Sequence, residues 1–367
     1  MFVTDLIAPR KDPQAIHIVT ALGSSEEKGA SFVRKIWKDS QTTRPQIYNQ
    51  YQSVYNDKNV DIVYIGTPHA MHKQNCLDAI EAGKSVLCEK PFTINEREAQ
   101  EVIDAARAKG VFIMEGLANT IAIINARSID TNFFALKLAV WTRFFPLMQS
   151  LHDHLYVKRS IGKIHRVFID FGLDMPLSEL PATSRLKDPA LGAGALLDIG
   201  IYPLTYASLV MGAGKLGKEY PDPKVTSVLT LVDGIDESNA VILRYEAQDA
   251  TAICTSTLSF RTPEKFARIE GSEGIITIFG VAASCPRAFK LKRTCAGNNQ
   301  SEKEVFRFDH PPGTTGFIYE ADAVARDIAH GRMESETMPL DETLRMLRLM
   351  DAIRRDGGLV YAQDEAK

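Results

Sequence analysis

The sequence lacks a surplus of charge of either sign, a long apolar run and a leader-like start. Lys and Arg number 43 against 46 Asp and Glu, a net charge of −3, so no basic excess is available to neutralise a nucleic-acid backbone. No apolar run approaches the ~20 residues that span a bilayer. Residues 1–10 lack the apolar core of a signal peptide. We therefore expect a cytoplasmic protein with neither a nucleic-acid nor a membrane partner.

Cysteine is also scarce and unpatterned. The five cysteines are odd in number and have no C-x-x-C spacing, which favours reduced thiols in a cytosolic protein. His152 and His154 lie close together, but no third or fourth ligand has matching spacing, so we expect no metal site. The sequence also contains no nucleophile elbow, which leaves a hydrolase unsupported.

What is present is ordinary globular composition over 367 residues, with 45% hydrophobic and 24% charged residues. This length suits about two domains. Short β-rich runs alternate with helical stretches over the first ~115 residues, which predicts a parallel, doubly wound sheet. The predicted strands are 15–22, 61–66, 85–89 and 111–115.

Beyond about residue 160 the strands follow one another with short turns, which predicts a mainly antiparallel sheet. These strands are 163–173, 224–232, 238–246, 251–260, 267–271 and 274–280. Helices are expected at 194–211, 317–330 and 340–355. We therefore expect a nucleotide-binding domain over 1–150, a substrate and dimerisation domain over 151–335, and a C-terminal helix and tail over 336–367.

Two motifs follow the predicted parallel strands. One strand ends in Thr67-Pro-His-x-x-His72, and about twenty residues later comes Gly83-Lys-x-Val-x-x-Glu-Lys-Pro91. Together, with this spacing, they resemble the glucose–fructose oxidoreductase and inositol dehydrogenase family. The segments 139–146 (Ala-Val-Trp-Thr-Arg-Phe-Phe-Pro) and 194–202 (Gly-Ala-Leu-Leu-Asp-Ile-Gly-Ile-Tyr) resemble its subgroup of dimeric dihydrodiol dehydrogenases and fungal NADP-dependent D-xylose 1-dehydrogenases.

The resemblance implies a Rossmann-type fold and an NAD(P)-dependent oxidoreductase. Hydride would pass between nicotinamide and a CH–OH group of a sugar or cyclic diol. The resemblance also implies a homodimer formed through the open face of the antiparallel sheet. Two alternatives remain open, namely a catalytically impaired member with a binding or regulatory role and a carbonyl reductase of secondary metabolism.

The proton that accompanies hydride transfer needs its own residues. Asp198 and Tyr202 are four residues apart and would share one helix face. A phenol with its ordinary pKa of ~10 is a poor base near neutral pH, and a nearby ammonium lowers that pKa. We expect Tyr202 to transfer the proton, Lys90 to activate it and donate to the hydroxyl, and Asp198 to orient them. The resemblance implies the same pairing.

For the cofactor, NADP is favoured over NAD. The strand that ends at residues 21–25 carries no acid before Glu26, and an acid there is usual in NAD-specific folds. Ser24, Ser25 and Lys28 could hold a 2′-phosphate instead. The resemblance implies that further cofactor contacts come from Thr67, Pro68, His69, His72, Glu89, Lys90, Pro91, Trp141 and Arg143.

Two departures from the family pattern stand out. The G-x-G-x-x-G fingerprint is absent. The central first strand and the helix N-terminus that would bind the pyrophosphate are absent with it. As written, the chain should bind dinucleotide poorly, and we hypothesise a start codon placed too late. An extra segment, 116–138, has neither a strand nor a helix period, which favours a retained intron over a genuine loop. Sequencing the transcript decides between the two.

Overall fold

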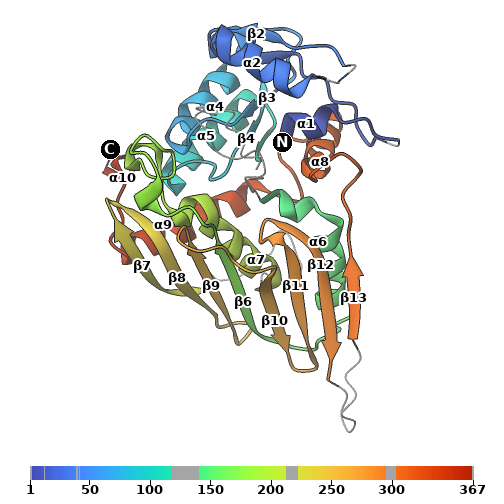
Figure 1. Cartoon of the computed structure of the whole chain (residues 1–367), viewed down its shortest axis with the longest axis vertical. Helices are drawn as coiled ribbons and strands as arrows, with labels where there is room; N and C mark the ends of the chain where they lie inside the picture. The colour runs from blue at the N-terminus through green and yellow to red at the C-terminus, as the bar shows by residue number, and fades with distance from the viewer. Residues whose placement is uncertain are drawn as a thin grey trace.

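The computed structural model describes residues 2–11, 13–38, 40, 42–116, 140–211, 222–294 and 303–365. For Val140 and Trp141 it describes the backbone alone. The predicted extra segment lies outside the described residues from position 117 onward. In Figure 1 the helices and short strands of the N-terminal part lie above one end of a large sheet.

The N-terminal part has two small parallel sheets. Strand β1 (Ala21–Gly23) pairs with β2 (Gln46–Tyr48), and β3 (Ile62–Ile65) pairs with β4 (Ser85–Cys88), which pairs with β5 (Ile113–Glu115). Among the described residues no pairing joins β1 to β3. The Rossmann-type parallel arrangement that the sequence predicted is therefore confirmed, in two pieces.

Helices connect these strands. They are α1 (Phe2–Ile7), α2 (Glu26–Ile36), α3 (Tyr51–Tyr55), α4 (His72–Glu81), preceded by the short η1 (His69–Met71), and α5 (Glu96–Lys109). The Asn95 side chain caps α5 by accepting from the Glu98 amide at 3.0 Å. Gly110 ends the helix in the left-handed conformation. Strand β1 is much shorter than the predicted 15–22, because Ile16 and Ile18 are exposed and lie outside the sheet.

The larger sheet has eight described strands in the order β13-β12-β11-β10-β6-β9-β8-β7. Only the β6–β9 pairing is parallel, so the prediction of a mainly antiparallel sheet is confirmed. The sequence missed β12 and β13. The strands are β6 (Ile164–Gly172), β7 (Lys224–Val232), β8 (Ile235–Tyr245), β9 (Ala250–Thr257), β10 (Lys265–Gly271), β11 (Gly274–Ala282), β12 (Cys285–Arg293) and β13 (Lys303–Arg307).

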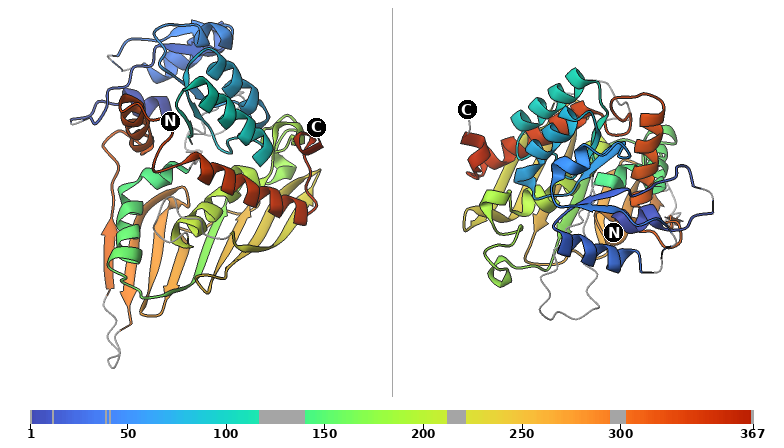
Figure 2. Two further views of the ribbon diagram at one scale, coloured as in Figure 1. Left: turned by 180° about the vertical axis from the view of Figure 1, so that it is seen from behind. Right: turned by 90° about the horizontal axis from the view of Figure 1, so that it is seen from above.

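Helices cover one face of this sheet, as the two opposite views in Figures 1 and 2 show. They include α6 (Pro146–His152), a π-helical turn (Leu196–Gly200) that continues into α7 (Ile201–Met211), and α9 (Leu340–Asp356). Helix α8 (Phe317–Ala329) instead packs against α1. Shorter helical turns are Val140–Phe144, Asp153–Val157, Leu177–Glu179, Pro189–Leu191 and α10 (Ala362–Glu365).

One helical stretch, Pro189–Met211, is long and apolar enough to cross a membrane by length and composition alone. In the structure 94% of its most apolar window is buried within the protein. It is a core helix, and its apolar surface packs between the large sheet and α9.

Candidate active site

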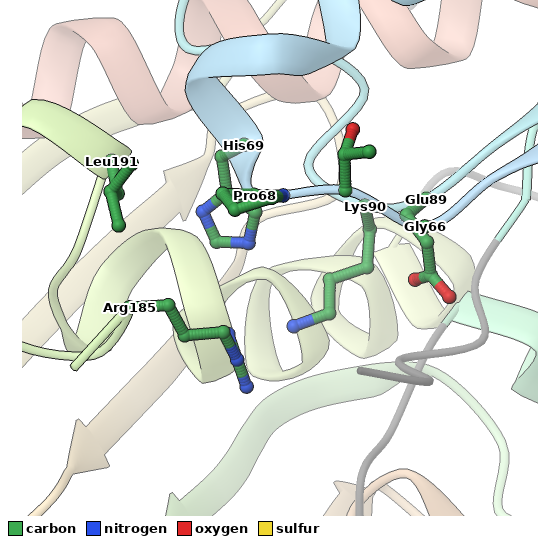
Figure 3. A pocket seen from close by; sticks show the side chains of 8 residues that line it. Gly66, Pro68, His69, Glu89, Lys90, Arg185 and Leu191 are labelled. Carbon is green, nitrogen blue, oxygen red and sulfur yellow. The ribbon is translucent and has the colours of Figure 1, made fainter. Parts of the chain in front are cut away.

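A small pocket lies where the two parts of the chain meet. One side of it consists of the carboxyl ends of β3 and β4. The opposite side comes from the segment that leads into the π-helical turn. The lining residues are Gly66, Thr67, Pro68, His69, Glu89, Lys90, Arg185 and Leu191 (Figure 3). Ligands of open parallel sheets bind at the carboxyl ends of the strands, so this pocket is the candidate active site.

Lys90 forms a buried contact with Asp198 across this junction. Its ammonium donates to the Asp198 carboxylate at 3.1 Å and also to the backbone oxygen of the same residue. The same ammonium lies 5.6 Å from the centre of the Tyr202 ring. Lys90 follows β4, whereas Asp198 and Tyr202 belong to the helix on the large sheet. The structure therefore brings together the three residues predicted to be catalytic.

Asp198 accepts from a second cation, Arg185, at 2.8 Å. Burial alone would raise the pKa of Asp198, but the Arg185 guanidinium and the Lys90 ammonium lower it far below its ordinary value. The carboxylate therefore stays charged near neutral pH. Burial lowers the pKa of Lys90, and Arg185 lowers it further against the opposing effect of Asp198.

The Tyr202 hydroxyl is buried and has no hydrogen-bond partner among the described residues. Burial raises its pKa well above 10, and the charge of Asp198 adds to the effect. The expected lowering of this pKa by Lys90 is therefore wrong for this structure, because burial and the nearby Asp198 charge both raise it. Near neutral pH Tyr202 is a phenol, which suits it to donate a proton.

His69 is a neutral ring on the pocket wall. Burial lowers its pKa to about 3, with a smaller contribution from His72. Its Nδ1 lies 2.9 Å from the carbonyl oxygen of Gly192, and since a carbonyl only accepts, Nδ1 carries the hydrogen and Nε2 is left as an acceptor. Gly192 has φ +73°, and a Cβ there would lie 2.2 Å from Ile94, so glycine permits this close approach.

His72 lies behind the pocket and is fully buried. One ring nitrogen lies 2.8 Å from the Thr67 carbonyl oxygen and the other 2.9 Å from that of Pro91. The ring thus bridges the two motif loops and is not one of the described residues that line the pocket. This position suits it to hold the loop at Thr67 and the loop at Lys90 in a fixed position relative to each other.

The remaining predicted cofactor residues are spread more widely. Ser24 is half-buried at the end of β1, and Ser25 and Lys28 are exposed at the start of α2. Arg143 is buried in an ion pair with Glu342 of α9. None of these four is among the described residues that line the pocket.

Some of the other predicted cofactor contacts line the pocket and some do not. Thr67, Pro68, His69 and Glu89 line the pocket, and Glu89 accepts from the Tyr64 hydroxyl. Pro91 is buried and follows Lys90 through a cis peptide bond. The Trp141 side chain lies outside the described residues.

The sequence missed Arg185. It is a single arginine thirteen residues before Asp198, in a segment without a regular period. The signal that could have found it is the expected charge of Asp198, since a carboxylate can accept more hydrogen bonds than one lysine supplies.

Comparisons with known proteins place this geometry in a family. A family model described as "Oxidoreductase family, NAD-binding Rossmann fold" matches residues 2–117. A second, described as "GFO/IDH/MocA C-terminal domain", matches residues 154–277. The chain is 31% identical to D-xylose 1-dehydrogenase (NADP(+)) of Hypocrea jecorina, over 94% of this chain and 84% of that protein. It is also 31% identical to trans-1,2-dihydrobenzene-1,2-diol dehydrogenase of Danio rerio, over 98% and 94%.

Solved structures share the fold. A 3-ketoreductase from Actinomadura kijaniata in complex with NADP and TDP-benzene superposes with a TM-score of 0.73, at 21% identity over 97% of this chain and 92% of that one. Aldose-aldose oxidoreductase from Caulobacter crescentus, complexed with glycerol, gives 0.70, also at 21% identity, over 94% and 90%. The chain therefore belongs to the GFO/IDH/MocA oxidoreductase family.

Proposed function

We propose that this chain is an NADP-dependent dehydrogenase that acts on a CH–OH group of a sugar or cyclic diol. The observation that carries the proposal is the convergence of Lys90, Asp198 and Tyr202 beside a pocket at the ends of β3 and β4. The names of the two relatives, a D-xylose dehydrogenase and a dihydrodiol dehydrogenase, support this substrate range. Reduction of a carbonyl is the same reaction in reverse.

NADP fits the residues at two points. The buried, unpartnered hydroxyl of Tyr202, whose ring lies 5.6 Å from the Lys90 ammonium, suits the nicotinamide end. The exposed side chains of Ser25 and Lys28, with Ser24 beside them, suit a 2′-phosphate at the end of β1. The NADP in the name of the fungal relative supports the same choice.

The bound cofactor would supply or accept the hydride. Tyr202 would donate its phenolic proton to the substrate oxygen during reduction, and its phenolate form would take the hydroxyl proton during oxidation. The ammonium of Lys90 would hydrogen-bond to that oxygen and stabilise its developing charge. Asp198 would keep the ammonium in place through their buried contact. Because the pKa of Tyr202 is raised, the oxidation rate should increase as the pH rises.

The test is turnover of a panel of aldoses, polyols and dihydrodiols with NADP⁺ and NAD⁺. We expect NADPH to form with at least one sugar or diol and expect Lys90→Met to slow it by about 100-fold or more. An equal rate in the Lys90→Met variant would contradict the assignment.

The described strands of the N-terminal part form two separate parallel sheets, whereas the sheet of a doubly wound dinucleotide-binding fold is continuous. This break favours a second candidate, a binding or regulatory role without turnover. Fluorescence titration with NADPH separates the candidates when it is combined with the turnover panel. Saturable binding without turnover on any substrate would favour the regulatory role.

We also propose a homodimer formed through the uncovered face of the large sheet. The strand register places Ile242, Ile253 and Phe168 in one row across this face. Arg166 and Arg268 lie 4.8 and 4.4 Å from the Phe168 ring centre. Isolated apolar residues are common on surfaces, but a continuous row suits a partner.

Buried free thiols at all four described cysteines support a cytoplasmic location.

A further inference from the structure

Arg185 shares one carboxylate oxygen with the proposed catalytic lysine. Its Nη1 donates to Asp198 Oδ1 at 2.8 Å, and the same oxygen accepts from Lys90 Nζ at 3.1 Å. Two bonds that meet at one atom keep the two nitrogens within about 6 Å of each other. The guanidinium therefore lies close to the ammonium that would bind the reacting oxygen.

The guanidinium also faces the pocket. Its side chain is 14% exposed, whereas those of Lys90 and Asp198 are 1% and 4% exposed. Figure 3 shows the Arg185 and Lys90 side chains approaching each other below His69. An arginine has five N–H donors, and only one of them donates within the part of the chain that the structure describes. The other donors are available to a bound molecule.

We propose that Arg185 positions the substrate by donating to an oxygen on the carbon next to the reacting carbon. This inference rests on the proposed function and narrows its substrate class to molecules with oxygens on two neighbouring carbons. N–H···O bonds are 2.7–3.2 Å long, so two adjacent oxygens can accept at the same time from nitrogens that are no more than about 6 Å apart. An aldopyranose and a trans-1,2-diol both have such a pair, whereas a simple secondary alcohol does not.

A purely electrostatic role for Arg185 predicts a different result. Arg185 lowers the pKa of both Asp198 and Lys90, so its loss would slow every substrate by the same factor. A direct contact instead slows only the substrates that have the neighbouring oxygen. A comparison of two substrates in two enzymes separates these effects.

The experiment measures kcat/KM for D-xylose and its 2-deoxy analogue with NADP⁺, in the wild-type chain, Arg185→Met and Arg185→Lys. If a cyclic diol proves to be the substrate, the pair is the diol and the corresponding alcohol with one hydroxyl. The wild-type chain should prefer the full substrate by roughly 10- to 100-fold, as expected for a hydrogen bond from a charged donor. Arg185→Met should reduce that preference to within about 3-fold. Arg185→Lys should keep part of it.

Lys187→Met is the matched control from the same segment. Its ammonium donates to the Leu177 carbonyl at 2.8 Å and lies 3.9 Å from Asp233, and it is not one of the described residues that line the pocket. This variant should keep the wild-type preference. Thermal melting of each variant confirms that it is folded.

Two results overturn the inference and remain distinguishable. If Arg185→Met slows both members of the pair equally, Arg185 acts through Asp198 alone and the proposed function stands. If the wild-type chain turns over no substrate of the wider panel, the proposed function fails and this inference fails with it.

Discussion

At the scale of single residues, two neighbouring tyrosines make the sharpest comparison. Tyr202 and Tyr206 lie one turn apart on α7, and both hydroxyls are buried without a hydrogen-bond partner in the described chain. An unsatisfied buried hydroxyl costs about 1–3 kcal/mol. Tyr202→Phe should therefore leave the free energy of unfolding unchanged or raise it by about 1 kcal/mol, while kcat falls by about 100-fold or more.

Tyr206→Phe is the control for that substitution. It removes an equally buried hydroxyl but leaves Tyr202, whose ring lies 5.6 Å from the Lys90 ammonium, intact. Stability should therefore change in the same direction while kcat stays within about 2-fold of wild type. Urea denaturation and steady-state kinetics on both variants give the comparison. A parallel loss of activity in both variants would show that the effect is structural.

Asp236 should make stability depend on pH. Its Oδ2 accepts from the Leu196 amide at 2.8 Å and from Asn239 at 3.0 Å, so it holds the start of the helix that contains Asp198. Burial raises its pKa from 3.8 to about 7. The folded state therefore holds a proton that the unfolded state has lost. Its stabilising effect is complete below about pH 4 and is lost as the pH rises to about 7.

Asp236→Asn isolates this effect. The amide oxygen can accept both hydrogen bonds, because both reach the same carboxylate oxygen, and the amide cannot ionise. Relative to wild type, the variant should gain roughly 2 kcal/mol of unfolding free energy between about pH 5 and pH 8. Denaturation curves at the two pH values test this. A constant difference would mean that Asp236 does not titrate in that range.

The sequence predicted these site residues unevenly. Lys90, Asp198 and Tyr202 each belong to a motif, and motifs fix residues relative to a strand end or a helix face. Arg185 belongs to no motif, and only folding brings it to Asp198. The sequence also could not separate the residues that line the pocket from His72 and Arg143, which are buried in contacts behind it or beside α9.

At the scale of elements, α9 ties the C-terminal segment to the N-terminal part. Arg354 is buried and donates to Asp351 at 2.6 Å, to Asp364 of α10 at 3.1 Å and to the Ile94 carbonyl at 3.3 Å. Removing one partner of a buried ion pair leaves the other charges uncompensated. Arg354→Met should therefore lower the free energy of unfolding by roughly 3 kcal/mol.

Arg348→Met on the same helix is the matched control. Arg348 is 54% exposed and pairs with Glu96 at 2.6 Å, and exposed pairs contribute about 0–1 kcal/mol. Its loss should lower the unfolding free energy by less than about 1 kcal/mol. Equal effects of the two substitutions in urea denaturation would show that α9 does not depend on its buried arginine.

The elements themselves were largely predictable where the hydrophobic period was clear. The prediction 224–232 matches β7, and 340–355 differs from α9 by one residue. The prediction 15–22 was wrong over most of its length, because an apolar run of this kind forms a strand only with a paired neighbour. Strand β12 was missed because charged Arg287, Lys290 and Lys292 interrupt its apolar residues.

At the scale of the whole molecule, the uncovered sheet face predicts association. Ile242 lies on that face and is 46% exposed. If two copies pair there, Ile242→Asp should place a charge in the interface and convert a dimer into a monomer in size-exclusion chromatography with light scattering. Ile18→Asp, at an exposed position outside the sheet, should leave the dimer intact. A wild-type chain that elutes as a monomer would contradict the proposed dimer.

The two-part architecture was predictable because the strand connections differ in length along the chain. Long helical connections demand parallel strands, and short turns demand antiparallel ones. The limits 1–150, 151–335 and 336–367 stay predictions. Helix α8 packs against α1, a contact between residues more than 300 positions apart in the chain that no local pattern indicates.

The most direct test of the account is the rate of NADPH formation when the purified chain is mixed with NADP⁺ and each sugar or diol in turn. The account predicts substrate-dependent NADPH formation by the wild-type chain. In Tyr202→Phe it predicts a rate that is lower by at least about 100-fold. It would be contradicted if NADPH formed equally fast in both proteins, or if no sugar or diol supported its formation in either.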